Sequence, residues 1–555
     1  MEIRRVRNLA VLALILAGYV AVQCALWTPA CTETDTEGYA VLAWHFARGT
    51  SPALVDDDPF RFHSHVWVNI PDGRVMPKYP PGLSVLMALG ILCFGHYGIF
   101  LVSPLCGLLA IVGAWKLFSL FVDRHWALFG TACLAAHPML VIYANYPLSH
   151  LADCCFAVWG LYFLFLAVQT FSWRHACVAG LACAAAAAVR PVSALLLLPL
   201  ATGALALLWK SWHAPQVLSR RRAIATVTAL CMGYLAVSVL HGLYNLHFFG
   251  SPFLTGYSFT DEQQAFTAAQ FTARYAPLVQ ALNGSWMPGL ILPGFIGLTL
   301  LPGRLPRLSL LGLALATIGV YSAYYWGDVI QWSFLRFFIF LMPVFMLGSL
   351  KTLELSMRHA GKPTRYAIMF ISLLFLASAY WAQYRMYYGI ACGPRIATAL
   401  AIRQTLATVA DPKGVYISSV EPEMGDWFPD ARIYTLAVLR PNYIEGAFRR
   451  NDLFIPWGQR ERQERITAWF RQQKVPAETF RDLLASYLTQ PDHAPVYVII
   501  PESELGSLQR QWPLCQWEHC ASLIGLRRDH RAAEIQRFPI GIYRLTPKVA
   551  KTPAI

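Results

Sequence analysis

The chain has 555 residues, of which 56% are hydrophobic and only 14% are charged, and its mean hydropathy is +0.43. A soluble domain carries about 25% charged residues, so this composition excludes a protein that lies entirely in water. The net charge of +14 comes from basic residues scattered between apolar segments. That pattern is typical of cytoplasmic loops and does not favour nucleic-acid binding. We therefore expect a polytopic helical membrane protein with membrane lipids, and no nucleic acid, among its partners.

The first apolar segment, residues 9–27, follows three arginines, Arg4, Arg5 and Arg7. A signal peptide begins in the same way. This segment is long enough to cross a bilayer and has no convincing cleavage site, so we expect a retained first span.

About ten further segments are candidates for spanning helices, because roughly 20 apolar residues cross the hydrocarbon core. Residues 81–94 are apolar too, but their length suits an interfacial or re-entrant helix better. The two segments that meet at Arg190-Pro191 are alternatively one broken helix. We thus expect about 11 spans, the later ones being residues 98–121, 126–143, 151–171, 176–190, 192–209, 223–247, 288–301, 308–326, 336–350 and 366–381.

The distribution of basic residues predicts the orientation of these spans. If residues 81–94 do not cross and the N-terminus is cytoplasmic, all the basic loops face the cytoplasm, including the arginines at 220–222. If residues 81–94 do cross, that arginine triplet lies outside. The first arrangement is favoured, and it predicts a transmembrane domain over residues 1–382 with an outer first loop, residues 28–80. It also predicts a soluble extracytoplasmic domain over residues 383–555.

The tail differs in kind from the rest of the chain, because charged residues are frequent in it. Val415-Tyr416-Ile417, residues 496–500 and residues 540–545 have the apolar runs of buried strands, and residues 460–473 form a polar helix candidate. These patterns predict a small α/β domain. Cys515 and Cys520 are candidates for a disulfide if this domain is extracytoplasmic.

Two polar features stand out in the outer first loop. The first is Thr34-Asp35-Thr36-Glu37-Gly38-Tyr39, where a carboxylate at the membrane surface can take a proton from a hydroxyl. The same residues also fit a helix N-terminus that Thr34 or Asp35 caps, and both interpretations can hold together. The second is Asp72-Gly73-Arg74 followed by Lys78-Tyr79-Pro80-Pro81-Gly82, which predicts a turn and then a helix that begins at proline.

This order of features resembles the GT-C glycosyltransferases, in the branch of protein O-mannosyltransferases and bacterial aminoarabinose transferases. The resemblance covers residues 1–382 and rests on an Asp-x-Glu-Gly-Tyr loop followed by Lys-Tyr-Pro-Pro-Gly at the start of an apolar helix. Further stretches that agree in order are His137-Pro138, Pro147-Leu148-Ser149, Ala188-Val189-Arg190-Pro191, residues 249–257 and Arg336-Phe337-Phe338.

The resemblance implies an enzyme that moves a sugar from a polyprenyl-phosphate carrier to an acceptor hydroxyl on the outer face of the membrane. The acceptor is then an unidentified glycan, lipid or protein. A direct displacement by that hydroxyl would invert the anomeric configuration. The resemblance also implies a multi-pass plasma-membrane location, as in a bacterial inner membrane.

The resemblance also implies roles for individual residues. Asp35 matches the first acid of the family's loop, the proposed general base, whereas Glu37 stands one position later than the usual second acid. Lys78 resembles the lysine before the family's Pro-Pro, although Tyr79 intervenes here. His150 stands close to the position where many relatives carry an acid. The expected substrate-binding residues are Tyr39, Tyr79 and His150.

Three cations, Lys78, Arg190 and Arg336, fall near the outer interface in the predicted topology. The leaving group of such a reaction is a lipid phosphate, which cations stabilise as the glycosidic bond breaks. The alternative is that these side chains snorkel toward the interface. No glycine-rich phosphate loop appears in the sequence, so nucleotide use has no support.

Two questions stay open from the sequence. His63-Ser64-His65 near the acids at 56–58 has weak divalent-metal spacing, and a solvated loop is the alternative, so the cofactor is unknown. Arg190 between apolar segments also fits a transporter or flippase of a lipid-linked glycan. The chain shows no repeat halves, and its polar residues cluster outside, which favours the enzyme over the transporter. A catalytically inactive relative that binds lipid is a third alternative.

Overall fold

The structure is a computed structural model that describes residues 2–55, 67–259, 266–324, 329, 332–387, 393–421, 423–436, 477–528 and 534–548. The chain divides into two compact units. The membrane unit comprises Met1–Trp27, Tyr79–Cys93 and Phe100–Tyr384. The α/β unit comprises Thr28–Lys78, Phe94–Ile99 and Arg385–Ile555.

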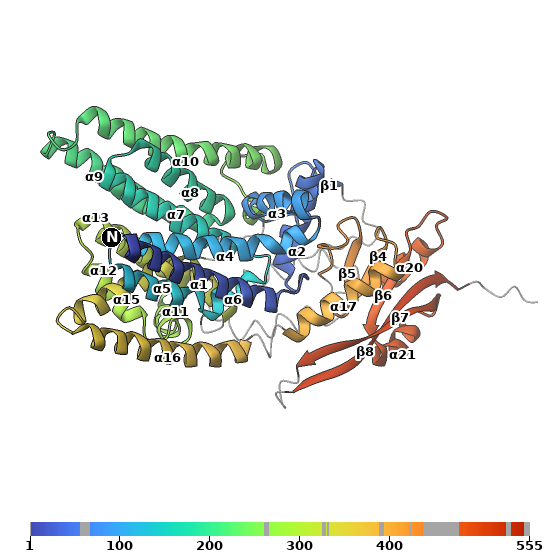
Figure 1. Ribbon diagram of the computed structural model, residues 1–555. Coiled ribbons are helices and arrows are strands. Elements are labelled where there is room, and N and C mark those ends of the chain that lie inside the picture. The colour runs from blue at the N-terminus through green and yellow to red at the C-terminus, as the bar shows by residue number, and fades with distance from the viewer. Residues whose placement is uncertain are drawn as a thin grey trace, which may run out of the picture. The chain divides into compact units, whose positions relative to one another are not determined.

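The membrane unit is a bundle of apolar helices (Figure 1). In the described residues, 8 helices are long and apolar enough to cross a membrane, or up to 9 if one bent pair counts as a span. That pair is α5 (Arg124–Ala135) and α6 (Pro138–Ala144), which meet at 53°. The long helices are α1 (Glu2–Leu26), α4 (Tyr97–Phe118), α7 (Ser149–Thr170), η1 with α9 (Pro191–Leu196, Leu197–His213), α10 (Arg220–Phe249), α13 (Arg304–Ala323), α14 with η5 and α15 (Trp332–Leu335, Arg336–Leu341, Met342–Ser356) and α16 (Lys362–Tyr387).

The remaining helices of this unit are short. The expected spans over residues 176–190 and 288–301 correspond to α8 (Trp173–Val189), with 17 residues, and α12 (Ile291–Thr299), with only 9. Residues 81–94 form α3 (Pro81–Phe94), whose 14 residues are short for a span, as the sequence predicts. The other short elements are η2 (Gly256–Phe259), α11 (Ala268–Ala281) and the π-turn η4 (Leu282–Trp286).

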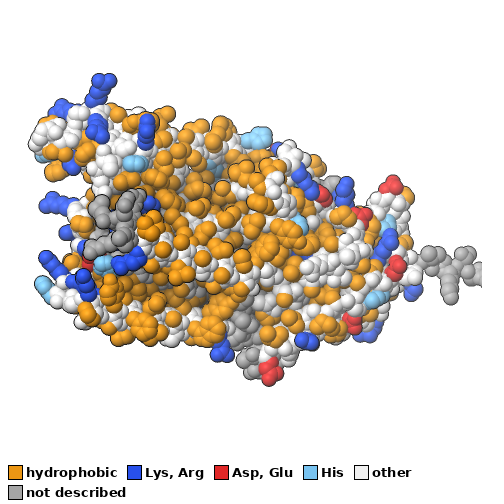
Figure 2. All heavy atoms as spheres, in the orientation of Figure 1, with side chains coloured by type: hydrophobic (Ala, Val, Ile, Leu, Met, Phe, Trp, Pro, Cys, Tyr) orange, Lys and Arg blue, Asp and Glu red, His pale blue; other side chains and the backbone are white. Residues whose placement is uncertain are grey.

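The surface of the membrane unit is that of a bilayer-spanning bundle. Apolar side chains cover its middle, and Lys and Arg side chains gather at the end that carries the α9–α10 and α15–α16 turns (Figure 2). Helix α16 is largely exposed, and the side chains on its surface include the large apolar residues Phe370 and Ile371. An apolar belt with a basic end is the pattern expected of membrane helices.

The α/β unit contains two sheets (Figure 1). The small sheet pairs β1 (Leu54–Val55), β3 (Arg74–Pro77) and β2 (Trp67–Asn69) in antiparallel fashion. The larger has the order β5-β4-β6-β8-β7, in which β5, β4 and β6 are parallel and the last two strands antiparallel. Its strands are β4 (Val415–Ser418), β5 (Arg432–Thr435), β6 (Val496–Pro501), β7 (Cys515–Arg528) and β8 (Ile535–Pro547).

Helices cover both faces of the five-stranded sheet. Val415 and Ile417 pack with residues of α20 (Ala477–Leu488) and α21 (Leu505–Gln511), which follows the short η8 (Glu502–Glu504). Tyr416, which points to the opposite face, packs with residues of α17 (Gly393–Val409). This alternation is the two-residue period of a strand that is buried on both faces.

Three strands predicted from the sequence are confirmed, namely those at 415–417, 496–500 and 540–545. The predicted helix over residues 460–473 lies outside the described residues. The disulfide between Cys515 and Cys520 is not formed, because both thiols are free and lie on the same strand, β7.

The first loop and the tail fold together. The sequence assigns residues 28–80 to the transmembrane domain, whereas in the structure Thr28–Lys78 belongs to the same compact unit as the tail. The cause is a set of long-range polar contacts between α2 (Thr34–Arg48) and the residues after β4, described below.

The packing of α8 against α10 generates a test of the membrane unit. A Cβ on Gly180 would overlap the Leu230 carbonyl oxygen, and a Cβ on Gly233 would overlap that of Cys177. Small residues at a helix crossing let the two backbones approach closely. We expect Gly180→Ala to destabilise the bundle by about 1–3 kcal/mol, because overpacking forces the helices apart.

The melting temperature of the detergent-solubilised protein measures this effect. Gly319→Ala on α13 is the matched control, since a Cβ there meets no atom within 4 Å. An equal melting temperature in both variants would contradict the close α8–α10 contact.

Candidate functional site

The local sequence dictates a helix break at Arg190. Helix α8 ends at Val189, Arg190 is extended with φ −144° and ψ 120°, and Pro191 begins η1. A residue before proline is disfavoured in the helical conformation, so the sequence Arg190-Pro191 ends the helix there. The break turns the Arg190 side chain toward the first turn of α7.

Arg190 lies at the centre of a buried polar cluster. Its guanidinium donates to His150 Nδ1 and, at 2.8 Å, to the Tyr321 hydroxyl. Arg190 Nε also lies 3.9 Å from a carboxylate oxygen of Asp153. The other Asp153 oxygen accepts a hydrogen bond from the Ser193 hydroxyl at 2.5 Å. The cluster thus joins α7, the α8–η1 break and α13.

An aromatic ring places a second arginine beside the first. The guanidinium carbon of Arg190 lies 5.0 Å from the centroid of the Phe337 ring, and that of Arg336 lies 5.6 Å from it. Tyr321 stacks on Phe337 with the ring planes 10° apart. Both arginines are largely buried. Two guanidinium groups over one ring repel each other, so this position favours a bound anion.

A third buried arginine lies near the same aromatic group. The guanidinium carbon of Arg274, on α11, is 4.9 Å from the ring centroid of Phe334. Phe334 in turn contacts Phe337 edge to face at 5.4 Å. Arg274 is not predictable as a site residue, because a lone arginine in a polar loop segment carries no signal of burial.

The acids of the first loop lie in the first turn of α2. The residue before the helix is Glu33, which makes no side-chain cap, so the prediction that Thr34 or Asp35 caps the helix is wrong. Asp35 and Glu37 lie at the positive end of the helix dipole, which stabilises carboxylates. Glu37 accepts a hydrogen bond from the Gly425 backbone N–H at 3.1 Å.

Burial makes Glu37 a weak acid. Loss of solvent raises the pKa of the Glu37 carboxyl from 4.5 to about 8, and the nearby Glu423 raises it further, while the Gly425 N–H opposes the shift. Burial likewise raises the pKa of Glu423 to about 7, with Glu421 adding to the shift. Glu37 therefore holds its proton over much of the neutral range.

The remaining predicted site residues are all buried. Tyr39 lies within α2, and Lys78 follows β3 in the α/β unit. Tyr79 belongs to the membrane unit and packs edge to face against Tyr257 at 6.2 Å. The structure thus brings Arg190, Arg336 and His150 together in one unit, and it places Asp35, Glu37, Tyr39 and Lys78 in the other.

The members of this cluster differ in how far the sequence marks them as functional. Asp153 is one helical turn after His150 on the same face, and a charged residue within an apolar helix is itself a functional signal. Ser193, Tyr321 and Phe337 look like ordinary helix residues in the sequence.

The metal question depends on residues outside the described ranges. Within the described residues, no group of three or more His, Cys, Asp and Glu side chains has the arrangement of a metal site. His63-Ser64-His65 and the acids at 56–58 are not among them.

One protein family resembles part of the membrane unit. Residues 78–240 match the family of dolichyl-phosphate-mannose-protein mannosyltransferases, and no curated protein matches the chain by sequence. The chain has the GT-C fold, as the order of its motifs predicts.

Solved structures that share this fold come from a bacterium and an archaeon. ArnT from Cupriavidus metallidurans, bound to undecaprenyl phosphate, is 14% identical with a TM-score of 0.55 over 95% of this chain and 97% of that chain. Its apo state is 12% identical with a TM-score of 0.53, over 96% and 97%. The Archaeoglobus fulgidus oligosaccharyltransferase in the apo form is 14% identical with a TM-score of 0.50, over 91% and 71%.

The buried state of Glu37 predicts a pH dependence of stability. A carboxyl whose pKa is raised from 4.5 to about 8 on folding binds its proton more tightly in the folded protein. Its contribution to stability is therefore greatest below pH 4.5 and is lost as the pH rises toward 8. We expect Glu37→Gln, which cannot ionise, to flatten this decline.

The melting temperature measured between pH 5 and pH 8 tests this prediction, and Glu518→Gln on exposed β7 is the control. A wild-type melting temperature that rises over this range, or a slope that Glu37→Gln leaves unchanged, would contradict it.

Proposed function

We propose that this protein transfers a sugar from a polyprenyl-phosphate carrier to an acceptor hydroxyl, with inversion at the anomeric carbon. The observation that carries the proposal is the pair Arg190 and Arg336 over the Phe337 ring, in a chain with the GT-C fold. The matched family is named for a dolichyl-phosphate sugar, and the similar ArnT was solved with undecaprenyl phosphate. A lipid-linked donor agrees with both.

The arginine pair suits the leaving group of this reaction. Breaking the bond between the sugar and the phosphate leaves negative charge on the phosphate oxygens. A planar guanidinium binds such oxygens through several N–H groups in a fixed geometry. Two of them, held in a water-poor setting by an aromatic ring, stabilise that charge more than they would in water. Lys78 is the third proposed phosphate ligand.

Asp35 is the proposed general base. It stands eight residues after Trp27, so the chain keeps it close to the end of the first span. Its carboxylate would accept the proton of the acceptor hydroxyl as that oxygen attacks the sugar. Glu37, two residues further along α2, mostly holds a proton at neutral pH and is the weaker candidate. Tyr39, Tyr79 and His150 remain proposed substrate contacts.

The proposed location is the plasma membrane, with the N-terminus in the cytoplasm and the α/β unit outside. The basic end of the membrane unit supports this orientation, since positive loops face the cytoplasm. A divalent metal remains a separate question, because the candidate ligands at 56–65 lie outside the described residues.

The deciding experiment supplies membranes containing the protein with labelled polyprenyl-phosphate mannose or aminoarabinose. Transfer of label to lipid, glycan or protein supports the proposal and identifies the acceptor class. Movement of the intact lipid-linked sugar across vesicles without transfer would instead support a flippase.

Removal of the base tests the role of Asp35. We expect Asp35→Asn to lower turnover by about 10² to 10⁴, because the amide keeps the size of the carboxylate but cannot take the proton. Glu37→Gln should cost less, since Glu37 already carries a proton at neutral pH. Turnover is compared at equal membrane abundance and saturating donor. Full activity in Asp35→Asn would defeat the assignment, and a larger loss in Glu37→Gln would transfer the role to Glu37.

A charge-conserving change tests the role of Arg190. We expect Arg190→Lys to lower kcat/KM for the donor by about 10², because lysine cannot replace the planar fork over Phe337. Arg174→Lys is the control, since the Arg174 guanidinium also stacks on a ring, that of Trp173. Equal kcat/KM in the two variants would return Arg190 to a snorkelling role.

A further inference from the structure

One short segment of the tail contacts α2 along its length. The residues that follow β4 as far as Asp430 form this segment, which we call the cradle loop (described residues 419–421 and 423–430). The Gly425 N–H binds Glu37, and the Asp426 carbonyl accepts from the Trp44 indole at 2.9 Å. Asp430 pairs with Arg48, in the last turn of α2, at 2.6 Å.

A fully buried ion pair fixes the chain just before α2. Arg403 and Asp426 both have 0% exposed side chains, and Arg403 Nε lies 3.0 Å from the Asp426 carboxylate. Asp426 accepts from the Cys31 N–H at 2.8 Å, and Arg403 donates to the Cys31 carbonyl at 2.7 Å. The pair therefore holds both polar groups of the Cys31 backbone, four residues before Asp35.

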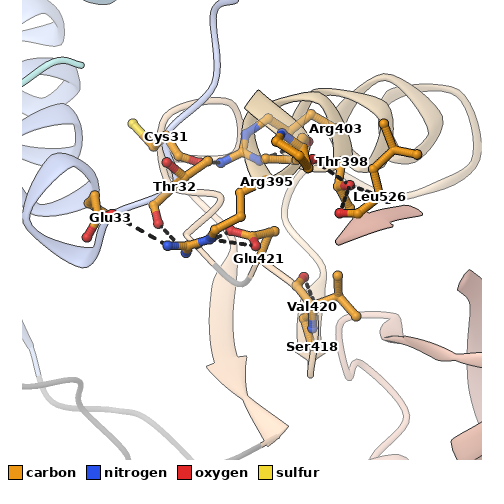
Figure 3. Close-up of polar contacts among 12 residues, drawn as sticks. Cys31, Thr32, Glu33, Arg395, Thr398, Arg403, Ser418, Val420, Glu421 and Leu526 are labelled. Atoms are coloured by element: carbon orange, nitrogen blue, oxygen red, sulfur yellow. Dashed lines mark hydrogen bonds and ion pairs between the residues drawn. The ribbon is translucent and has the colours of Figure 1, made fainter. Parts of the chain in front are cut away.

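Arg395, also on α17, binds the residue after Cys31. Its guanidinium donates to the Thr32 carbonyl at 2.7 Å and pairs with Glu421 at 3.0 Å (Figure 3). Arg395 and Arg403 are eight residues apart, about two helical turns, so they project from one face of α17. Thr398, between them, exchanges hydrogen bonds with the backbone of Leu526 on β7.

The cradle loop leaves no room for a side chain at the position that faces Glu37. A Cβ on Gly425 would lie 2.7 Å from a methyl group of Val41 and 3.1 Å from Glu37 Oε1. Both distances are tighter than an ordinary contact, so the loop and α2 are in close contact here. A side chain at position 425 would therefore require Glu37 to move by a few tenths of an ångström.

We propose that the cradle loop is a positioning element of the active site, and that Arg403 and Gly425 are its positioning residues. They act through the backbone of α2, which they hold at its start and beside Glu37, and so set where Asp35 presents its carboxylate. This inference rests on the proposed function. It makes the tail a component of the catalytic site rather than an appended domain.

The first test places a methyl group in the cradle. We expect Gly425→Ala to lower kcat at least about tenfold, because a shift of about 1 Å in a reacting group is enough to slow the reaction. The donor KM should stay unchanged, because the atoms nearest to a Cβ at position 425 belong to Val41 and Glu37 and not to a proposed phosphate ligand. Gly506→Ala is the matched control, since in the same α/β unit a Cβ there meets nothing closer than 3.9 Å.

The second test weakens the ion pair between Arg403 and Asp426 and measures the exposure of Cys31. Cys31 is fully buried, and burial raises the pKa of its thiol well above the usual range, so it should resist maleimide. In a background where Cys31 is the sole cysteine, Arg403→Lys should speed its modification at least about tenfold and lower kcat in parallel, because lysine cannot hold Asp426 and Cys31 together. Arg510→Lys, on the exposed face of α21, should change neither.

The outcomes separate this inference from the proposed function. If the wild type transfers no sugar, the proposed function fails. If the wild type is active and Gly425→Ala keeps its kcat, the inference alone fails. It also fails if the variants lose only abundance or melting temperature at unchanged turnover per folded molecule, or if Cys31 becomes reactive in Arg403→Lys without loss of kcat.

Discussion

The ion pair between Arg403 and Asp426 is the interaction on which the α/β unit depends. Neither side chain is exposed, and Asp426 binds the Cys31 N–H while Arg403 binds the Cys31 carbonyl. A buried pair is stabilising only when its remaining hydrogen-bonding groups are satisfied. Here the backbone of Cys31, Ala399 and Glu423 supplies those partners, so the pair fixes a geometry rather than merely adding stability.

The two arginine centres of the molecule differ in a way that follows from their tasks. Arg403 lies 3.0 Å from its carboxylate, whereas Arg190 lies 3.9 Å from Asp153 and hydrogen-bonds to the neutral hydroxyl of Tyr321. In a close ion pair the carboxylate offsets the charge of the guanidinium, so the arginine holds the structure together and does not attract a further anion. A loose pair leaves the arginine more of its charge, which a membrane segment tolerates only where a function requires it.

Several features of the fold were predictable because the bilayer leaves few choices. Residues that face lipid must be apolar over a span, and Arg190-Pro191 must interrupt a helix, so both features followed from the sequence. The strand at 415–417 followed from three successive apolar residues of high strand propensity. Glu33, rather than Thr34 or Asp35, precedes α2, because Thr34 already has helical geometry, and side-chain type alone does not distinguish these positions.

The contacts that join the first loop to the tail were not predictable in the same way. Cys31 and Asp426 are 395 residues apart, and a charged residue in a polar tail looks like a solvated surface in the sequence. Arg403 and Asp426 are buried only because α17 packs against the chain around Cys31 in the folded protein. The same holds for Tyr321 and Phe337, whose helices meet Arg190 through tertiary packing alone.

The two compact units hold their ionisable groups in different surroundings. Asp35 and Glu37 belong to the α/β unit, and Arg190 and Arg336 belong to the membrane unit. Glu37 is buried beside Glu423, which raises the pKa of both carboxyls, and the arginines share an aromatic ring. The raised pKa of Glu37 leaves Asp35 as the proposed base, and the cradle loop is the proposed element that positions both acids.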